Sequence, residues 1–214
     1  MKEDRRIRKT KSSIKQAFTK LLQEKDLEKI TIRDITTRAD INRGTFYLHY
    51  EDKYMLLADM EDEYISELTT YTQFDLLRGS SIEDIANTFV NNILKNIFQH
   101  IHDNLEFYHT ILQLERTSQL ELKINEHIKN NMQRYISINH SIGGVPEMYF
   151  YSYVSGATIS IIKYWVMDKQ PISVDELAKH VHNIIFNGPL RIMAENRLHK
   201  SNLGFTNLSN TRFS

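Results

Sequence analysis

The side chains best suited to hydrogen-bond with phosphates and base edges gather in residues 31–57. They are Arg43, Thr45, Tyr47 and His49, all within the second of two short helical patterns. The apolar residues Phe46 and Tyr50 recur at i and i+4 in the same segment, which predicts that they form its buried face. A short helix with one buried and one polar face is typical of a helix that enters the DNA major groove.

Such a helix needs a second helix and a tight turn to hold it. Thr31, three residues before Asp34, fits a capping pair at the start of a first helix. Asp40 is expected to end that helix, because Asp tolerates a left-handed backbone. Asn42 is expected to cap the second helix, with Ile41 placed under the turn. The spacing therefore predicts a helix-turn-helix.

Residues 5–57 resemble the N-terminal part of the TetR/AcrR family of bacterial transcription regulators. The matching elements are, in order, Leu21-Leu22, Thr31-Ile32, Asp34-Ile35, Ala39, Thr45-Phe46-Tyr47, His49-Tyr50, Lys53 and Leu56. Two positions depart from the family pattern: Asp40 stands where the family often has Gly, and Thr36 stands where a small Ala is usual. Both departures indicate a slightly altered turn, and neither removes a contact group.

The resemblance implies a set of DNA-binding residues. They are Thr31, Arg33, Arg43, Thr45, Tyr47, His49 and Lys53. It implies phosphate contacts for Thr31 and Lys53 and a backbone contact for His49. It places Arg43, Thr45 and Tyr47 toward the groove, while Arg33 reaches a base or the backbone in some members. The alternative for each charged residue is an ordinary solvated side chain, and the sequence does not separate base readers from phosphate contacts.

Charge is distributed unevenly along the chain. The whole chain has 27 basic and 27 acidic residues. Residues 1–56 hold 14 Lys and Arg against 9 Asp and Glu, whereas the remainder holds 13 against 18. The densest basic cluster is Lys2, Arg5, Arg6, Arg8, Lys9 and Lys11. We expect it to lie along phosphates or to enter the minor groove; the alternative is a solubilising terminus, although Lys9 and Lys11 should sit on the first helix.

Composition and length indicate an all-α protein with two domains. The 214 residues include only 7 Gly and 3 Pro, and the helical periodicities are long. We expect residues 1–56 to form the three-helix DNA-binding domain and residues 57–200 a C-terminal helical ligand-binding and dimerisation domain. Residues 201–214 are polar and aperiodic, so we expect a mobile tail.

Several function classes lack support in this sequence. The absence of Cys excludes disulfides, thiolate nucleophiles and Cys-based zinc sites. The two His-x-His pairs, at residues 100–102 and 180–182, diverge on a helix and cannot share a metal. No phosphate-cradling Gly loop, metalloprotease motif or nucleophile elbow appears. We therefore expect no enzyme activity, no metal and no cofactor, and without an apolar leader segment we expect no secretion.

Residues 148–162 form an uncharged run of 15 residues. This run is too short and too polar to span a membrane, which needs about 20 apolar residues, so we expect a helix buried on two sides. The side toward its own domain is expected to carry Phe150, Val154, Ala157, Ile161 and Trp165. The other side, with Gly156 at a close crossing, would face a second subunit. The family resemblance implies that this helix and residues 174–187 form a four-helix bundle in a homodimer.

The sequence thus predicts a cytoplasmic, homodimeric regulator that binds a palindromic double-stranded DNA operator, most simply as a ligand-responsive repressor. An alternative is a co-activator of the same family that acts mainly through a protein partner, but the intact groove-facing residues favour direct DNA binding. The residues that could line a small-molecule effector pocket are Tyr108, His109, Tyr151, Tyr153 and Trp165. Each of them fits equally well as a core or interface residue.

Overall fold

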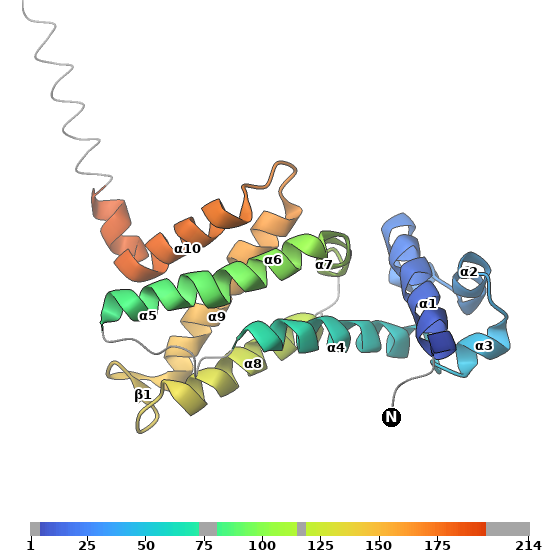
Figure 1. Cartoon of the computed structure of the whole chain (residues 1–214), viewed down its shortest axis with the longest axis horizontal. Helices are drawn as coiled ribbons and strands as arrows, with labels where there is room; N and C mark the ends of the chain where they lie inside the picture. Colours follow the sequence, from blue (N-terminus) through green and yellow to red (C-terminus); the bar gives the residue numbers. More distant parts are fainter. Residues whose placement is uncertain (1–4, 73–80, 115–118, 196–214) are drawn as a thin grey trace, which may run out of the picture. The chain divides into compact units, whose positions relative to one another are not determined.

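The computed structural model describes residues 5–72, 81–114 and 119–195 (Figure 1). The chain divides into two compact units. The first comprises residues 1–76 and 99–171, and the second comprises residues 77–98 and 172–214. The boundary expected after residue 56 falls inside a helix of the first unit and stays a prediction. The tail expected at residues 201–214 lies outside the described residues.

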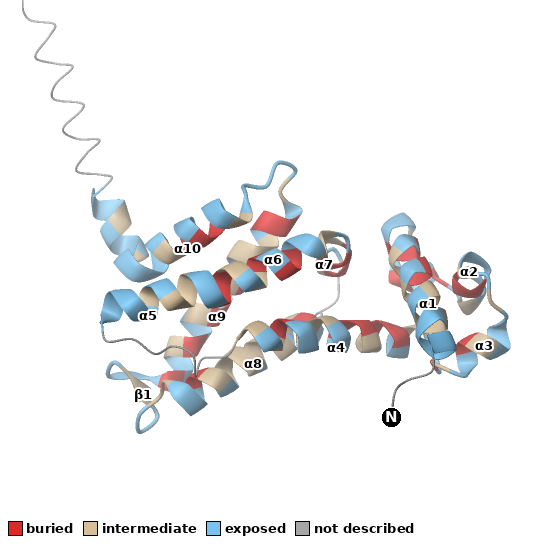
Figure 2. Cartoon of the chain, viewed as in Figure 1, coloured by how far each residue is buried: buried red, intermediate tan, exposed pale blue. Residues whose placement is uncertain are grey.

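The first unit begins with the helices that resemble a DNA-binding domain. They are α1 (Arg5–Glu24), the 3-10 turn η1 (Leu27–Lys29), α2 (Ile32–Arg38), α3 (Arg43–Tyr47) and α4 (Lys53–Tyr71). α1 is amphipathic and buries Ile14 and Phe18 against α2 and its neighbours. Ile35 and Phe46 are also fully buried, so each short helix contributes to one small core (Figure 2).

The remaining elements of the first unit are also mostly helical. They are the end of α6 (Lys95–Asp103), α7 (Leu105–Leu112), α8 (Gln119–Tyr135), the strands β1 (Ser141–Ile142) and β2 (Val145–Pro146), and α9 (Glu147–Met167). Tyr64 of α4 stacks on Phe107 of α7 with ring centroids 3.7 Å apart. This stacking joins α4 to the rest of the unit, and the expected all-α fold class is confirmed.

A two-stranded hairpin connects α8 to α9. Ile142 and Val145 pair antiparallel around Gly143 and Gly144. Both glycines have positive φ, 56° and 82°, which suits a tight turn between strands. Glu147, the first residue of α9, is buried and fixes the hairpin, because its carboxylate accepts hydrogen bonds from Ser137, Gln133 and His140.

The buried face of α9 differs from the one predicted. Tyr151, Ser155 and Ile159 are buried in the first unit, whereas the predicted core residue Ala157 is exposed. Of the other predicted core residues only Trp165 is fully buried; Phe150, Val154 and Ile161 are half-buried. The helix is apolar nearly all round, so its sequence pattern does not single out one face.

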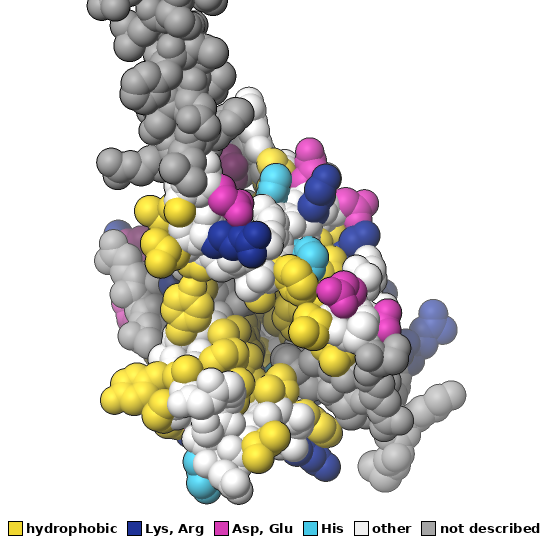
Figure 3. All heavy atoms as spheres, turned by 90° about the vertical axis from the view of Figure 1, so that its left-hand side faces the viewer, with side chains coloured by type: hydrophobic (Ala, Val, Ile, Leu, Met, Phe, Trp, Pro, Cys, Tyr) yellow, Lys and Arg dark blue, Asp and Glu magenta, His cyan; other side chains and the backbone are white. Residues whose placement is uncertain are grey.

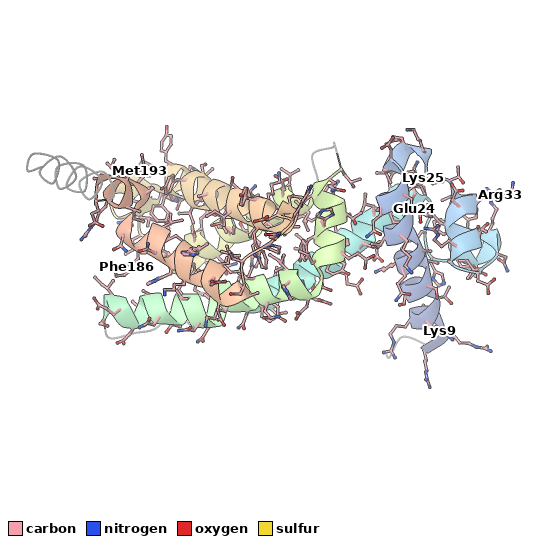
Figure 4. The ribbon with its side chains drawn as sticks, turned by 90° about the horizontal axis from the view of Figure 1, so that it is seen from above. Lys9, Glu24, Lys25, Arg33, Phe186 and Met193 are labelled. Atoms are coloured by element: carbon pink, nitrogen blue, oxygen red, sulfur yellow. The ribbon has the colours of Figure 1, made fainter. Side chains whose placement is uncertain are left out.

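The second unit contains α5 (Ile82–Thr88), the π-helical segment η3 (Phe89–Leu94) and the start of α6. It also contains the whole of α10 (Val174–Asn187). Ser173 and Glu176 form a capping box at the start of α10, and Lys95 pairs with Asp175 at 2.7 Å. The large exposed hydrophobic residues toward the end of this unit are Ile184, Ile185, Phe186, Leu190 and Met193. Figure 3 shows hydrophobic side chains at this surface, and Figure 4 labels Phe186 and Met193 on it. In the described part of the chain, no helix is long and apolar enough to cross a membrane.

Candidate DNA-binding interface

α2 starts at the capping pair that the sequence predicted. The Thr31 hydroxyl accepts a hydrogen bond from the Asp34 amide at 3.2 Å, and the Asp34 carboxylate accepts the Thr31 amide at 2.8 Å. The same carboxylate also accepts from the Thr31 hydroxyl and from Lys25, both at 2.8 Å. The Lys25 ammonium, together with the Thr31 donors, holds the pKa of Asp34 well below its usual range. Both donors of Thr31 therefore have partners within the chain, which bears on its predicted phosphate contact.

The turn between α2 and α3 has the predicted geometry. Asp40 adopts φ 54°, the left-handed conformation that Asp tolerates better than most residues. The Ile41 amide then donates to the Thr36 carbonyl at 3.0 Å, which closes the turn. Asn42 caps α3, because its side-chain oxygen accepts from the Thr45 amide at 2.7 Å and from the Thr45 hydroxyl at 3.0 Å.

The outward face of α3 is rotated relative to the predicted one. Phe46 and Tyr50 are buried as predicted, with exposed fractions of 0% and 2%. The residues on the opposite side are exposed; they are Arg43, Gly44, Tyr47 and Leu48. Thr45 and His49, expected on this face, are half-buried. The structure therefore brings Arg43 and Tyr47 together at the surface and sets Thr45 and His49 at its edge.

Arg43 and Tyr47 form one surface pair. The Arg43 guanidinium donates to the Tyr47 hydroxyl at 3.3 Å, and its carbon lies 6.0 Å from the centre of the Tyr47 ring. The two side chains are one helical turn apart, so this contact orients both of them along α3. Together they present cationic and phenolic donors that suit phosphates and base edges.

Leu48 is a surface residue that the sequence reasoning missed. It is 81% exposed at the end of α3, directly beside Tyr47. A leucine in this position is suited to an apolar contact, such as the methyl group of thymine in the major groove. The sequence did contain a signal for it. Leu48 stands between two polar residues predicted to face the groove, and its spacing does not place it on the buried face of Phe46 and Tyr50.

Lys53 and Arg33 occupy different surroundings. The Lys53 ammonium donates to the carbonyls of Leu27, Glu28 and Ile30 at 2.8, 2.9 and 3.0 Å. Arg33 is exposed on α2, and Figure 4 places its side chain at the outer side of that helix. Arg33 is thus available for DNA, whereas the predicted phosphate contact of Lys53 competes with three internal hydrogen bonds.

The basic cluster near the N-terminus is helical where the structure describes it. α1 begins at Arg5, so Arg5, Arg8 and Lys9 lie on its first turns and are exposed. Figure 4 shows Lys9 on this end of α1. Residues 5–11 are therefore helical, and the expected position of the cluster along phosphates or in the minor groove stays a prediction. Lys2 lies outside the described residues.

Metal-binding side chains do not cluster in the described part of the chain. Among the described residues, no three His, Asp or Glu side chains are placed to share a metal ion. Of the residues considered for an effector pocket, Tyr108, Tyr151 and Trp165 are buried and His109 is half-buried. Tyr153 is 61% exposed, so these residues do not all line one site.

Both halves of the chain match described protein families. Residues 15–60 match the family described as "Bacterial regulatory proteins, tetR family", and residues 90–187 match "Transcriptional regulator C-terminal region". A curated relative, the uncharacterized HTH-type transcriptional regulator YxbF of Bacillus subtilis, is 22% identical over 177 residues. That match covers 81% of this chain and 44% of the relative, so the chain spans less than half of the relative's length.

Solved structures of similar proteins share the fold. A TetR transcriptional regulator from Streptococcus agalactiae has 26% identity and a TM-score of 0.61, over 85% of this chain and 96% of that one. NalD, the secondary repressor of the MexAB-OprM multidrug efflux pump in Pseudomonas aeruginosa, has 17% identity and a TM-score of 0.59. That second match covers 85% of this chain and 97% of the NalD chain.

Proposed function

Because the chain belongs to the TetR family of DNA-binding transcription regulators, we propose that it is a homodimeric repressor of a pseudo-palindromic operator. The observation that carries the proposal is the surface of α3. Arg43, Tyr47 and Leu48 are exposed together while Phe46 and Tyr50 anchor the helix in the core. A helix held in this way can enter the major groove without unfolding its support.

The proposed contacts fall into two groups. Arg43, Tyr47 and Leu48 would face the base edges, and the exposed Arg33 on α2 would reach the DNA backbone or a base. Thr31, Thr45 and His49 lie at the helix starts and at the edge of α3, where phosphates pass. Since both donors of Thr31 and the hydroxyl of Thr45 bind within the chain, we propose that these threonines mainly set the helix ends and that His49 contacts a phosphate.

A second copy of the chain is the proposed partner of α9. The exposed side of α9 carries Tyr149, Tyr153 and Tyr164, which are 74%, 61% and 76% exposed. Gly156 lies on this side, and a Cβ added to it would meet nothing within 4 Å. A self-complementary apolar face around a small residue suits a two-fold interface. The dimer would present two α3 helices to two half-sites.

We also propose that binding of a small-molecule effector releases the protein from DNA. The protein would bind its operator in the cytoplasm. Support for repression comes from the relative NalD, whose name describes it as a repressor. The effector would bind among the helices of the C-terminal part, near aromatic residues such as Tyr108 and Trp165. A melting-temperature screen of small molecules, followed by operator release with each hit, tests this element.

The operator itself is tested with the DNA that flanks the protein's own gene. A gel shift with increasing unlabelled competitor should show one preferred site, and footprinting should show two symmetric half-sites. Expression of a reporter from the same DNA should rise when the protein is removed. Reporter expression that falls instead, or DNA binding that appears only with a second protein, would favour the co-activator alternative.

A further inference from the structure

We propose that Lys53 is a positioning residue for DNA reading: it holds the connector between α1 and α2 on the first turn of α4. This role replaces the phosphate contact that the sequence suggested. The DNA measurements below rest on the proposed function, whereas the hydrogen-exchange measurement does not. The proposal concerns one side chain and the three carbonyls that surround it.

The donors of Lys53 are fully used within the chain. A lysine ammonium has three protons, and the Lys53 ammonium lies 2.8, 2.9 and 3.0 Å from the carbonyl oxygens of Leu27, Glu28 and Ile30. Each of these is a hydrogen bond from a charged donor, which is stronger than a neutral one. A phosphate oxygen would have to displace one of the carbonyls and leave it without its cationic partner.

The three carbonyls offset an unfavourable position of the Lys53 charge. Lys53 is the first residue of α4, where the partial positive charge of the helix disfavours a cation. The carbonyls that end η1 supply the negative ends of three dipoles at this point. Next to it, the Tyr54 hydroxyl donates to the Glu28 carboxylate at 2.6 Å, so two consecutive residues of α4 hold the same connector.

The clamp formed by Lys53 and these three carbonyls acts on α2 and α3 through the backbone that joins the connector to α2. Ile30 directly precedes Thr31, which is the N-cap of α2. α2 packs on α3, which carries the exposed Arg43 and Tyr47. A shift of the connector therefore tilts α2 and the face of α3. Reading of base edges requires that orientation, whereas sequence-independent attraction to phosphates does not.

Two substitutions separate a clamp from a phosphate contact. Lys53→Met keeps the aliphatic stem and removes all donors. Lys53→Arg keeps the charge, but its planar fork cannot converge on three carbonyls. If Lys53 is a clamp, both variants should lose about tenfold or more in affinity for the operator, with unchanged affinity for random DNA. The slope of log K against log[salt] should also stay unchanged.

A phosphate contact predicts a different result. In that case Lys53→Arg should bind the operator as wild type does, and Lys53→Met should flatten the salt slope by about 0.9 and weaken random DNA equally. Lys29→Met is the matched control, since Lys29 lies in the same connector and pairs only with Asp26 at the described surface. It measures the effect of losing one positive charge there without loss of the clamp.

Amide hydrogen exchange tests the clamp without DNA. In both Lys53 variants the amides of residues 28–34 should exchange faster, while those of α1 and the later turns of α4 should not. The DNA measurements are made well below the melting temperature of every variant, so that all of the protein is folded. Under these conditions, loss of a residue that only stabilises the fold would leave the preference for the operator unchanged. Unchanged exchange in this connector, or operator binding by Lys53→Arg equal to wild type, would overturn the proposal. If wild type shows no operator preference, the proposed function fails while the exchange result still decides the clamp.

Discussion

The hydroxyl of Tyr50 donates to the carboxylate of Asp59 at 2.9 Å, and this contact ties the segment just after α3 to α4. Asp59 also pairs with Lys15 of α1 at 2.8 Å. Burial opposes ionisation of Asp59, but the hydrogen bonds from Lys15 and Tyr50 outweigh it, so the pKa of this carboxyl lies below its ordinary value. One carboxylate thus joins three parts of the DNA-binding region.

Removal of the Tyr50 hydroxyl tests this joint. Tyr50→Phe should lower the free energy of unfolding by about 1 kcal/mol, because the buried ring stays while one hydrogen bond to a charged acceptor is lost. Urea denaturation followed by circular dichroism measures the change. Tyr54→Phe, which removes the hydroxyl bound to the exposed Glu28, is the comparison and should cost less. Equal losses in the two variants would argue against a special role for Asp59.

The hairpin anchor should make stability depend on pH. Hydrogen bonds from Ser137 and Gln133, which outweigh burial, and from His140 lower the pKa of Glu147 from 4.5 to about 2. A carboxyl with a lowered folded-state pKa stabilises the fold fully above its unfolded value, and this contribution disappears as the pH falls through the folded value. The melting temperature of wild type should therefore fall between about pH 4.5 and pH 2. The melting temperature of the Glu147→Gln variant should fall less over that range. The melting temperature of Glu83→Gln, a change at an exposed position, should follow that of wild type.

Leu48 should sense thymine methyl groups in the operator. Replacing a contacted thymine with uracil removes one methyl group, so it should weaken wild-type binding several-fold, in line with about 0.8 kcal/mol per buried carbon. The same DNA change should have no effect on Leu48→Ala, because the apolar partner is already gone. Isothermal titration of both proteins against both DNAs gives the coupling directly. Equal losses for the two proteins would place Leu48 away from the thymine.

Tyr47→Ala should weaken operator binding without unfolding the protein. Tyr47 is 49% exposed, so truncation removes a contact with DNA and little of the core. A gel shift gives the affinity, and the melting temperature serves as the control for folding. A Tyr47→Ala protein that binds its operator as tightly as wild type would mean that another surface reads the DNA.

Gly156→Leu should shift the protein from dimer toward monomer. A Cβ added at Gly156 meets nothing within 4 Å apart from its own helix backbone and chain neighbours, so we expect the folded monomer to accept leucine. In the proposed dimer the same leucine would separate two closely packed helices, and operator affinity should fall because one half-site binds more weakly than two linked ones. Sedimentation at micromolar concentration measures the change, with Asn130→Leu at an exposed position of α8 as the control. An unchanged dimer would assign the interface to another face.

Local chemistry let the sequence determine both ends of α2, the start of α3 and with them the helix-turn-helix. The capping pairs Thr31–Asp34 and Ser173–Glu176 each join residues three positions apart, so the interacting atoms meet as soon as the helix forms. The left-handed Asp40 and the buried pair Phe46 and Tyr50 follow from residue type and helical spacing in the same way. These features depend on neighbours in the chain and are visible without a tertiary structure.

Contacts between distant residues were decided only by the tertiary structure. The Lys53 ammonium binds carbonyls more than twenty residues earlier in the chain. The sequence around a lysine does not reveal whether its partner is a phosphate or a carbonyl. The buried face of α9, with Tyr151 inside and Ala157 outside, could not be predicted because nearly every side of that helix is apolar. The outward position of Leu48 depends on how α3 rotates against its core. In each case the free energy comes from packing between segments, and that packing has no local signature in the sequence.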